Sequence, residues 1–142
     1  MGSPTSPVAT WRDVRRIALK LPGTSEELSS SGTPAWIVYK KFFVWERPLR
    51  RADLAALGDR APTGPILGVR TPDLEMKDVL LASDPRVFFT TPHFDGYPAV
   101  LVRLEKISTS HLEDVIVEAW LACAQKRAVA AYLRENQGDS PG

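Results

Sequence analysis

The sequence predicts an α+β domain in which helices pack on one face of an antiparallel sheet. Segments with helical and strand-like patterns follow in the order helix, strands, helix, strands, helix. Short hairpin turns, rather than long crossovers, join most of the strand segments. The 142 residues, 44% hydrophobic and 25% charged, suffice for one domain with a substantial core. We expect this domain at residues 10–133, between a flexible leader at 1–9 and a flexible tail at 134–142.

The first helix is expected at residues 10–21. Thr10 and Asp13 have the spacing of a capping box, and Pro22-Gly23 ends the helical pattern. One face is apolar, with Trp11, Val14, Ile17, Ala18 and Leu21. The opposite face is basic, with Arg12, Arg15, Arg16 and Lys20.

The segment that follows is expected as a polar loop at 26–34 and two short strands within 35–46. A turn near Tyr39-Lys40 would pair Trp36 with Phe43 across this hairpin. Residues 47–64 are irregular, with a helical turn at 52–57.

The second half repeats the pattern. A strand at 65–70 precedes a helix that Thr71 caps and that runs to about residue 82. Strands at 86–91 and 99–107 form a second hairpin. The last long helix begins near Ser108 or Ser110, and Ser110 with Glu113 makes a capping box. Helix resumes or continues through 125–133.

Composition excludes several classes of protein. No apolar run approaches the roughly 18 residues of a membrane helix, and the first ten residues lack the pattern of a signal peptide. The single cysteine, Cys123, has no internal partner, which favours a reducing cytoplasm. We expect a cytoplasmic monomer without a membrane partner.

The loop at 92–98 contains the residues that most resemble a metal-binding or catalytic site. His93 and Asp95 supply only two of the three or four protein ligands that a zinc site usually has, and no motif supplies a third. No nucleophile elbow or phosphate loop is present. We therefore expect no catalytic residue, no metal and no cofactor.

A rigid turn explains this loop more fully. Asp95-Gly96 is a turn signal, and Pro92 and Pro98 stiffen its two sides. An exposed rigid loop can still bind a partner. The candidate contact residues are His93, Phe94, Asp95 and Tyr97.

A basic and aromatic cluster at 39–51 is the second candidate site. It contains only one acidic residue, Glu46, and five basic residues: Lys40, Lys41, Arg47, Arg50 and Arg51. Such side chains neutralise phosphates, and interleaved aromatics stack on bases. The alternative is that the aromatics are core and that the lysines guard a solvated turn and strand edge.

Four segments resemble the MmcQ/YjbR family across residues 10–133. They are "LPGTSEELSSSGTPAW", "VYKKFFVW", "LLASDPRVFFTTPHFDGYPAVLVRLEKI" and "EAWLACAQKRAVAAYL". Members often carry glycine in place of Lys40 and proline in place of Gln125. The resemblance implies a fold similar to CyaY, the bacterial frataxin, and a DNA-binding role. It also marks Lys41 as the recurrent charged residue where anion contact is expected, whereas the basic first helix argues against frataxin-like iron binding.

These observations lead to one functional expectation and two alternatives. We expect a non-enzymatic domain that binds DNA weakly through the basic cluster at residues 40–51. The first alternative is a module for a protein or a small anionic ligand that uses the 92–98 loop and the adjacent sheet. The second is an enzyme centred on His93 and Asp95.

Overall fold

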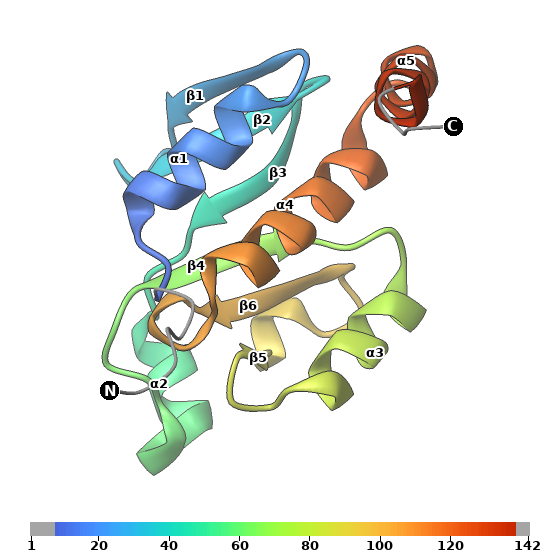
Figure 1. Cartoon of the computed structure of the whole chain (residues 1–142). Helices are drawn as coiled ribbons and strands as arrows, with labels where there is room; N and C mark the ends of the chain where they lie inside the picture. The colour runs from blue at the N-terminus through green and yellow to red at the C-terminus, as the bar shows by residue number, and fades with distance from the viewer. Residues whose placement is uncertain (1–7, 139–142) are drawn as a thin grey trace, which may run out of the picture.

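The computed structural model describes residues 8–138, which form an antiparallel sheet with helices packed against it (Figure 1). The helices are α1 (Trp11–Lys20), α2 (Arg51–Leu57), α3 (Leu74–Ser83), α4 (Thr109–Cys123) and α5 (Lys126–Gly138). The strands are β1 (Thr24–Leu28), β2 (Pro34–Val38), β3 (Lys41–Glu46), β4 (Ile66–Arg70), β5 (Phe88–Phe89) and β6 (Ala99–Arg103). Their order in the sheet is β1-β2-β3-β4-β6-β5, and every neighbouring pair is antiparallel. The predicted α+β class is confirmed.

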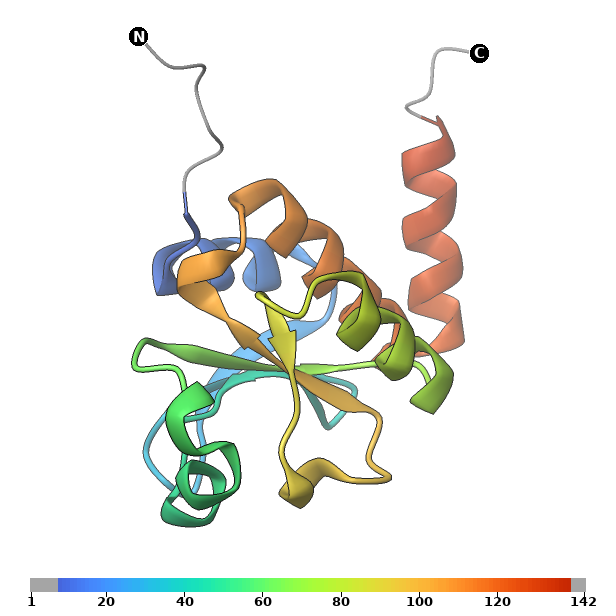
Figure 2. The ribbon, with the colours of Figure 1, turned by 90° about the horizontal axis from the view of Figure 1, so that it is seen from below.

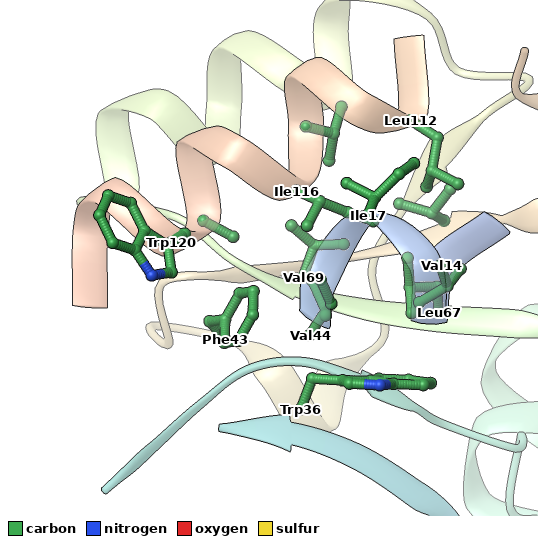
Figure 3. Close-up of a cluster of buried hydrophobic side chains, with 14 of the residues drawn as sticks. Val14, Ile17, Trp36, Phe43, Val44, Leu67, Val69, Leu112, Ile116 and Trp120 are labelled. Carbon is green, nitrogen blue, oxygen red and sulfur yellow. The ribbon is translucent and has the colours of Figure 1, made fainter. Parts of the chain in front are cut away.

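The two faces of the sheet are covered differently. Helices α1, α3 and α4 lie on one face, while α2 and the 3-10 turn Pro92–Phe94 lie on the other (Figure 2). The main core fills the first interface, where side chains of α1 and α4 meet those of β2, β3 and β4 (Figure 3). A smaller cluster lies on the second face and consists of Ile66, Phe89, Phe94, Ala99 and Leu101. We call this second face the open face, because it is only partly covered.

The capping of α1 follows the sequence pattern, and the capping of α3 does not. The backbone N–H of Thr10 donates to Oδ2 of Asp13 at 2.9 Å, as predicted. Helix α3 begins at Leu74, because Oδ1 of Asp73 accepts the N–H of Met76 at 2.8 Å. The prediction that Thr71 caps this helix is therefore wrong.

The last two helices are separated by a short break. Ser108 caps α4 by accepting the N–H of His111 at 3.2 Å, so Ser108 rather than Ser110 is the cap. Helix α5 then extends to Gly138, beyond residue 133, where we expected the domain to end. No helix within residues 8–138 is long and apolar enough to cross a membrane.

The fold also begins earlier than residue 10. Ala9 is buried, and its N–H donates to the carbonyl oxygen of Ile107 at 3.0 Å. The last two residues of the expected leader thus belong to the fold. Residues 1–7 and 139–142, which make up the rest of the expected leader and part of the expected tail, lie outside the described residues.

Strand β1 replaces much of the expected polar loop at 26–34. It is an edge strand whose residues 25–28 are all exposed, so its sequence lacks the alternation that marks a half-buried strand. Only the turn at 29–33 remains as loop.

The β2–β3 hairpin turns where predicted but contains a bulge. Tyr39 and Lys40 have φ angles of 49° and 64°, which suit a tight two-residue turn. The register shifts between Trp36 and Ile37, so Trp36 pairs with Val44 and the predicted Trp36–Phe43 pairing is wrong. The extra residue turns both Phe43 and Val44 toward the main core.

Candidate binding surfaces

Arg47 is a structural residue and not an exposed DNA contact. Only 5% of its surface is exposed, and its Nη2 atom lies 3.1 Å from Oδ2 of Asp53. Its guanidinium group also lies over the ring of Phe94, 5.3 Å from the centroid, and donates to the carbonyl oxygen of Pro48. The expectation that Arg47 binds DNA is therefore wrong, because the side chain is buried against α2 and the 92–98 loop.

Asp53 holds this arrangement together. Its Oδ2 atom accepts the backbone N–H of Arg50 at 2.9 Å, which caps α2. Burial raises the pKa of Asp53, but the Arg50 hydrogen bond and the Arg47 charge outweigh burial and hold the pKa below its usual value. Asp53 is therefore a buried carboxylate whose negative charge Arg47 balances and the Arg50 N–H stabilises.

The other four predicted DNA contacts are all exposed, but they do not form one patch. Lys40 and Lys41 lie at the hairpin turn, at the start of β3. Arg50 and Arg51 lie beyond the other end of β3, where α2 begins. A six-residue strand spans about 20 Å. The predicted cluster is therefore split between two ends of the molecule.

Lys41 instead meets the beginning of α5. Tyr39 and Lys41 line a hollow of about 520 Å³ together with residues 122–127 of the α4–α5 junction. Its cations are Lys41, Lys126 and Arg127, and the described residues contribute no acidic side chain to its lining. We call this site the basic hollow. The sequence reasoning missed Lys126 and Arg127, which lie 85 or more residues from Lys41.

Tyr39 and Cys123 also line the basic hollow. The Nζ atom of Lys41 lies 6.0 Å from the ring centroid of Tyr39, whose side chain is exposed. Cys123 is buried at the hollow, and burial raises the pKa of its thiol, while the charges of Arg70 and Lys41 act in the opposite direction. The cysteine is thus held as a neutral thiol and adds no negative charge to the three cations of the hollow.

The open face carries a second and larger depression, which we call the groove. Its volume is about 670 Å³. One wall is the serine-rich turn at 29–33, and the other is formed by His93, Phe94, Asp95 and Tyr97. Phe42 and Trp45 of β3 lie between the walls, and Arg50 also lines the groove. The groove therefore unites the loop candidates with two residues of the basic cluster, the buried Arg47 and the exposed Arg50.

Trp45 lies against the sheet because β4 has a glycine beneath it. A Cβ atom at Gly68 would lie 2.4 Å from Cε2 and 2.7 Å from Nε1 of Trp45, too close for any side chain. The half-buried indole therefore packs one side on the backbone of β4 and contributes to the groove. The glycine that interrupts the strand pattern is the sequence signal for this contact.

A buried lysine of α3, Lys77, holds the loop wall of the groove in place. Lys77 of α3 is 5% exposed and donates through Nζ to the carbonyl oxygens of Phe94 and Tyr97, the latter at 2.9 Å. Burial lowers the pKa of Lys77, and the charges of Asp95 and Asp78 oppose that shift. The expected rigid loop thus depends on a lysine that sequence reasoning did not single out.

His93 is exposed on this wall and contacts Phe94 edge-to-face, with ring centroids 4.9 Å apart. The other histidine, His111, makes its own edge contact with Phe88 at 5.5 Å. Within residues 8–138, no group of three or more His, Cys, Asp or Glu side chains is arranged to hold a metal ion.

Comparison with known proteins places this arrangement in a family. The model of the YjbR family matches residues 19–122. The chain belongs to the YjbR family. Uncharacterized protein Rv2570 of Mycobacterium tuberculosis and uncharacterized protein Mb2600 of Mycobacterium bovis are each 50% identical over 129 residues, which cover 89% of this chain and 97% of the relative.

A solved YjbR-type structure supports the fold. Protein DR2400 of Deinococcus radiodurans, whose domain belongs to family DUF419, has a TM-score of 0.63 and 18% sequence identity. The match covers 93% of this chain and 91% of that chain. At this identity, the similarity describes the arrangement of helices and strands, and function rests on the surfaces described above.

Proposed function

We propose that this YjbR domain is a non-enzymatic DNA-binding protein that contacts phosphates through the basic hollow. The single observation that carries the proposal is the meeting of Lys41 with Lys126 and Arg127 around one hollow that no described acidic side chain lines. Lys40, which precedes Lys41 in the chain, is also exposed. This surface replaces the basic cluster at residues 40–51 as the candidate interface.

The chemistry of the hollow suits a phosphate backbone. Lysine and arginine side chains neutralise phosphates and release counterions, which supplies most of the affinity in binding that does not depend on sequence. The exposed ring of Tyr39, beside Lys41, offers a stacking surface for a base or sugar. These features support weak binding that depends on salt and reads no sequence.

The overall charge of the chain contributes little to the attraction of a polyanion. The net charge of the chain is only +1, so the protein as a whole does not attract a polyanion strongly. Attraction must therefore come from a local concentration of cations, and the basic hollow provides one.

A binding assay with two charge-matched variants tests the proposal. We expect a labelled duplex of about 20 base pairs to bind at low salt, as measured by fluorescence anisotropy, and a Lys41→Ala/Lys126→Ala/Arg127→Ala variant to lose at least about tenfold in affinity. The control is Arg50→Ala/Arg51→Ala/Arg60→Ala, which removes three exposed cations far from the hollow. Equal losses in both variants would mean that total charge, and not the basic hollow, governs binding.

A further inference from the structure

The groove on the open face has the size of a small-molecule site and is separate from the basic hollow. Its volume of about 670 Å³ lies within the range of roughly 300–1,000 Å³ that is usual for such sites. Among its rings, Phe94 is buried and Trp45 is half-buried, whereas Phe42, His93 and Tyr97 are exposed and accessible to a ligand. The question is which chemistry the lining fits.

Trp45 and Phe42 provide a platform for a planar ring. The indole of Trp45 packs on the backbone at Gly68, which fixes its plane against the sheet. Phe42 lines the same groove and is 38% exposed. Aromatic rings in such positions bind another ring by offset or edge contact.

Arg50 provides a positive charge in the lining of the groove. Its side chain is exposed and makes no ion pair within residues 8–138, whereas the charge of Arg47 is already balanced by Asp53. An unpaired guanidinium group beside an aromatic surface binds a carboxylate or phosphate through two parallel hydrogen bonds.

The two acidic residues that line the groove, Glu46 and Asp95, do not pair with Arg50. Glu46 pairs with Leu67 across the strands, and Leu67 belongs to the main core, so the Glu46 side chain is directed to the opposite side of the sheet from Trp45. Asp95 lies on the loop wall, where its charge acts on the buried ammonium group of Lys77.

The walls are already ordered. Lys77 holds the loop by its bonds to the carbonyl oxygens of Phe94 and Tyr97. On the other wall, Oγ of Ser29 lies 2.9 Å from Oγ1 of Thr33. A ligand would therefore lose little affinity to ordering of the protein.

From these contacts we infer that the groove binds a small aromatic acid, with its ring on Trp45 and Phe42 and its anionic group on Arg50. This site is independent of the proposed nucleic-acid surface. It gives the 92–98 loop a second role, as the wall of a ligand site.

The inference is tested with two probes that differ only in charge, 2-naphthoate and 2-naphthylmethanol. Titration is followed by ¹H–¹⁵N NMR. We expect naphthoate to shift the indole N–H of Trp45 and the amides of residues 93–97, and to bind at least about fivefold more tightly than the alcohol.

Three variants assign the two parts of the ligand. Arg50→Gln should abolish the preference for naphthoate, whereas Arg51→Gln, which changes an exposed arginine outside the groove, should preserve it. Trp45→Leu should weaken both probes, with retained folding checked by circular dichroism. Equal affinity for the two probes would overturn the assignment of the anionic group to Arg50. The absence of shifts at Trp45 with either probe at millimolar concentration would overturn the site itself, while leaving the nucleic-acid proposal untouched.

Discussion

The Nη2 atom of Arg47 lies 3.1 Å from Oδ2 of Asp53, and both side chains are almost fully buried. The pair joins the end of β3 to the first turn of α2. Because Arg47 also lies over Phe94, the same guanidinium group connects the strand, the helix and the loop wall of the groove. A cation that the sequence suggested as a nucleic-acid contact therefore organises the open face.

Removing one partner of this pair should be costly. We expect Asp53→Ala to lower the free energy of unfolding by about 3–5 kcal/mol, because the change leaves the buried guanidinium group of Arg47 without a counter-charge and removes the cap of α2. Urea unfolding followed by circular dichroism measures this loss.

The matched comparison is a variant that replaces both partners with apolar residues, Arg47→Met/Asp53→Leu. This double variant should be more stable than Asp53→Ala, since neither charge then remains buried alone. A double variant at least as unstable as Asp53→Ala would mean that the cap, rather than the ion pair, provides the stability.

Stability should also decline in acid because of Asp53. Its pKa in the folded protein lies below the ordinary value of 3.8, so the unfolded chain binds the proton more readily. The resulting stabilisation is fully present above the unfolded pKa and is lost as the pH falls through the folded pKa. Urea unfolding between pH 6 and pH 2.5 should show a shallower acid decline for Asp53→Asn than for the native chain. Asp59→Asn, a change of an exposed carboxylate in the same region, should keep the native slope.

Gly68 should resist substitution because of Trp45. A Cβ atom there would lie 2.4 Å from Cε2 of the indole, so Gly68→Ala should destabilise the protein by about 1–3 kcal/mol. Thermal unfolding measures the effect. In a Trp45→Leu background the same Gly68→Ala change should cost clearly less, and an undiminished cost would show that the contact with Trp45 is not the cause.

A substitution in the β2–β3 hairpin turn should instead increase the stability of the protein. Lys40 has a φ of 64°, which is unfavourable for a residue with a Cβ atom. Lys40→Gly should therefore raise the stability by up to about 1 kcal/mol, seen as a higher Tm. Lys40→Ala removes the same charge but keeps the strain, and should not stabilise the fold.

Local patterns in the sequence were sufficient for most of the helices. The cap of α1 by Thr10 and Asp13 depends on residues three positions apart. Helix α4 begins at Thr109, within the predicted region near Ser108 or Ser110, although Ser108 and not Ser110 caps it. Strand β1 was not recognised, because an exposed edge strand has no alternating pattern. The predicted Trp36–Phe43 pairing was wrong because β3 contains a bulge. Packing against the core determines such a bulge, and local sequence patterns do not reveal it.

The binding surfaces were harder to predict because they join distant segments. The burial of Arg47 depends on Asp53 in α2 and Phe94 in a loop, which the charge pattern at 39–51 does not contain. The anion contact expected at Lys41 remains a prediction, and the other cations of its hollow, Lys126 and Arg127, lie at the other end of the chain. The loop residues at 93–97 do meet in one groove, but their anchor, Lys77, lies in a helix that the sequence presented as ordinary.

The measurement that tests the central claim most directly is the salt dependence of duplex binding. If Lys40, Lys41, Lys126 and Arg127 each neutralise a phosphate, the slope of log affinity against log salt should be about −3 to −4, and affinity should fall roughly 100-fold between 50 and 200 mM salt. The Lys41→Ala/Lys126→Ala/Arg127→Ala variant should bring this slope close to −1. Absence of binding at 50 mM salt, or a slope that the variant leaves unchanged, would contradict nucleic-acid binding through the basic hollow.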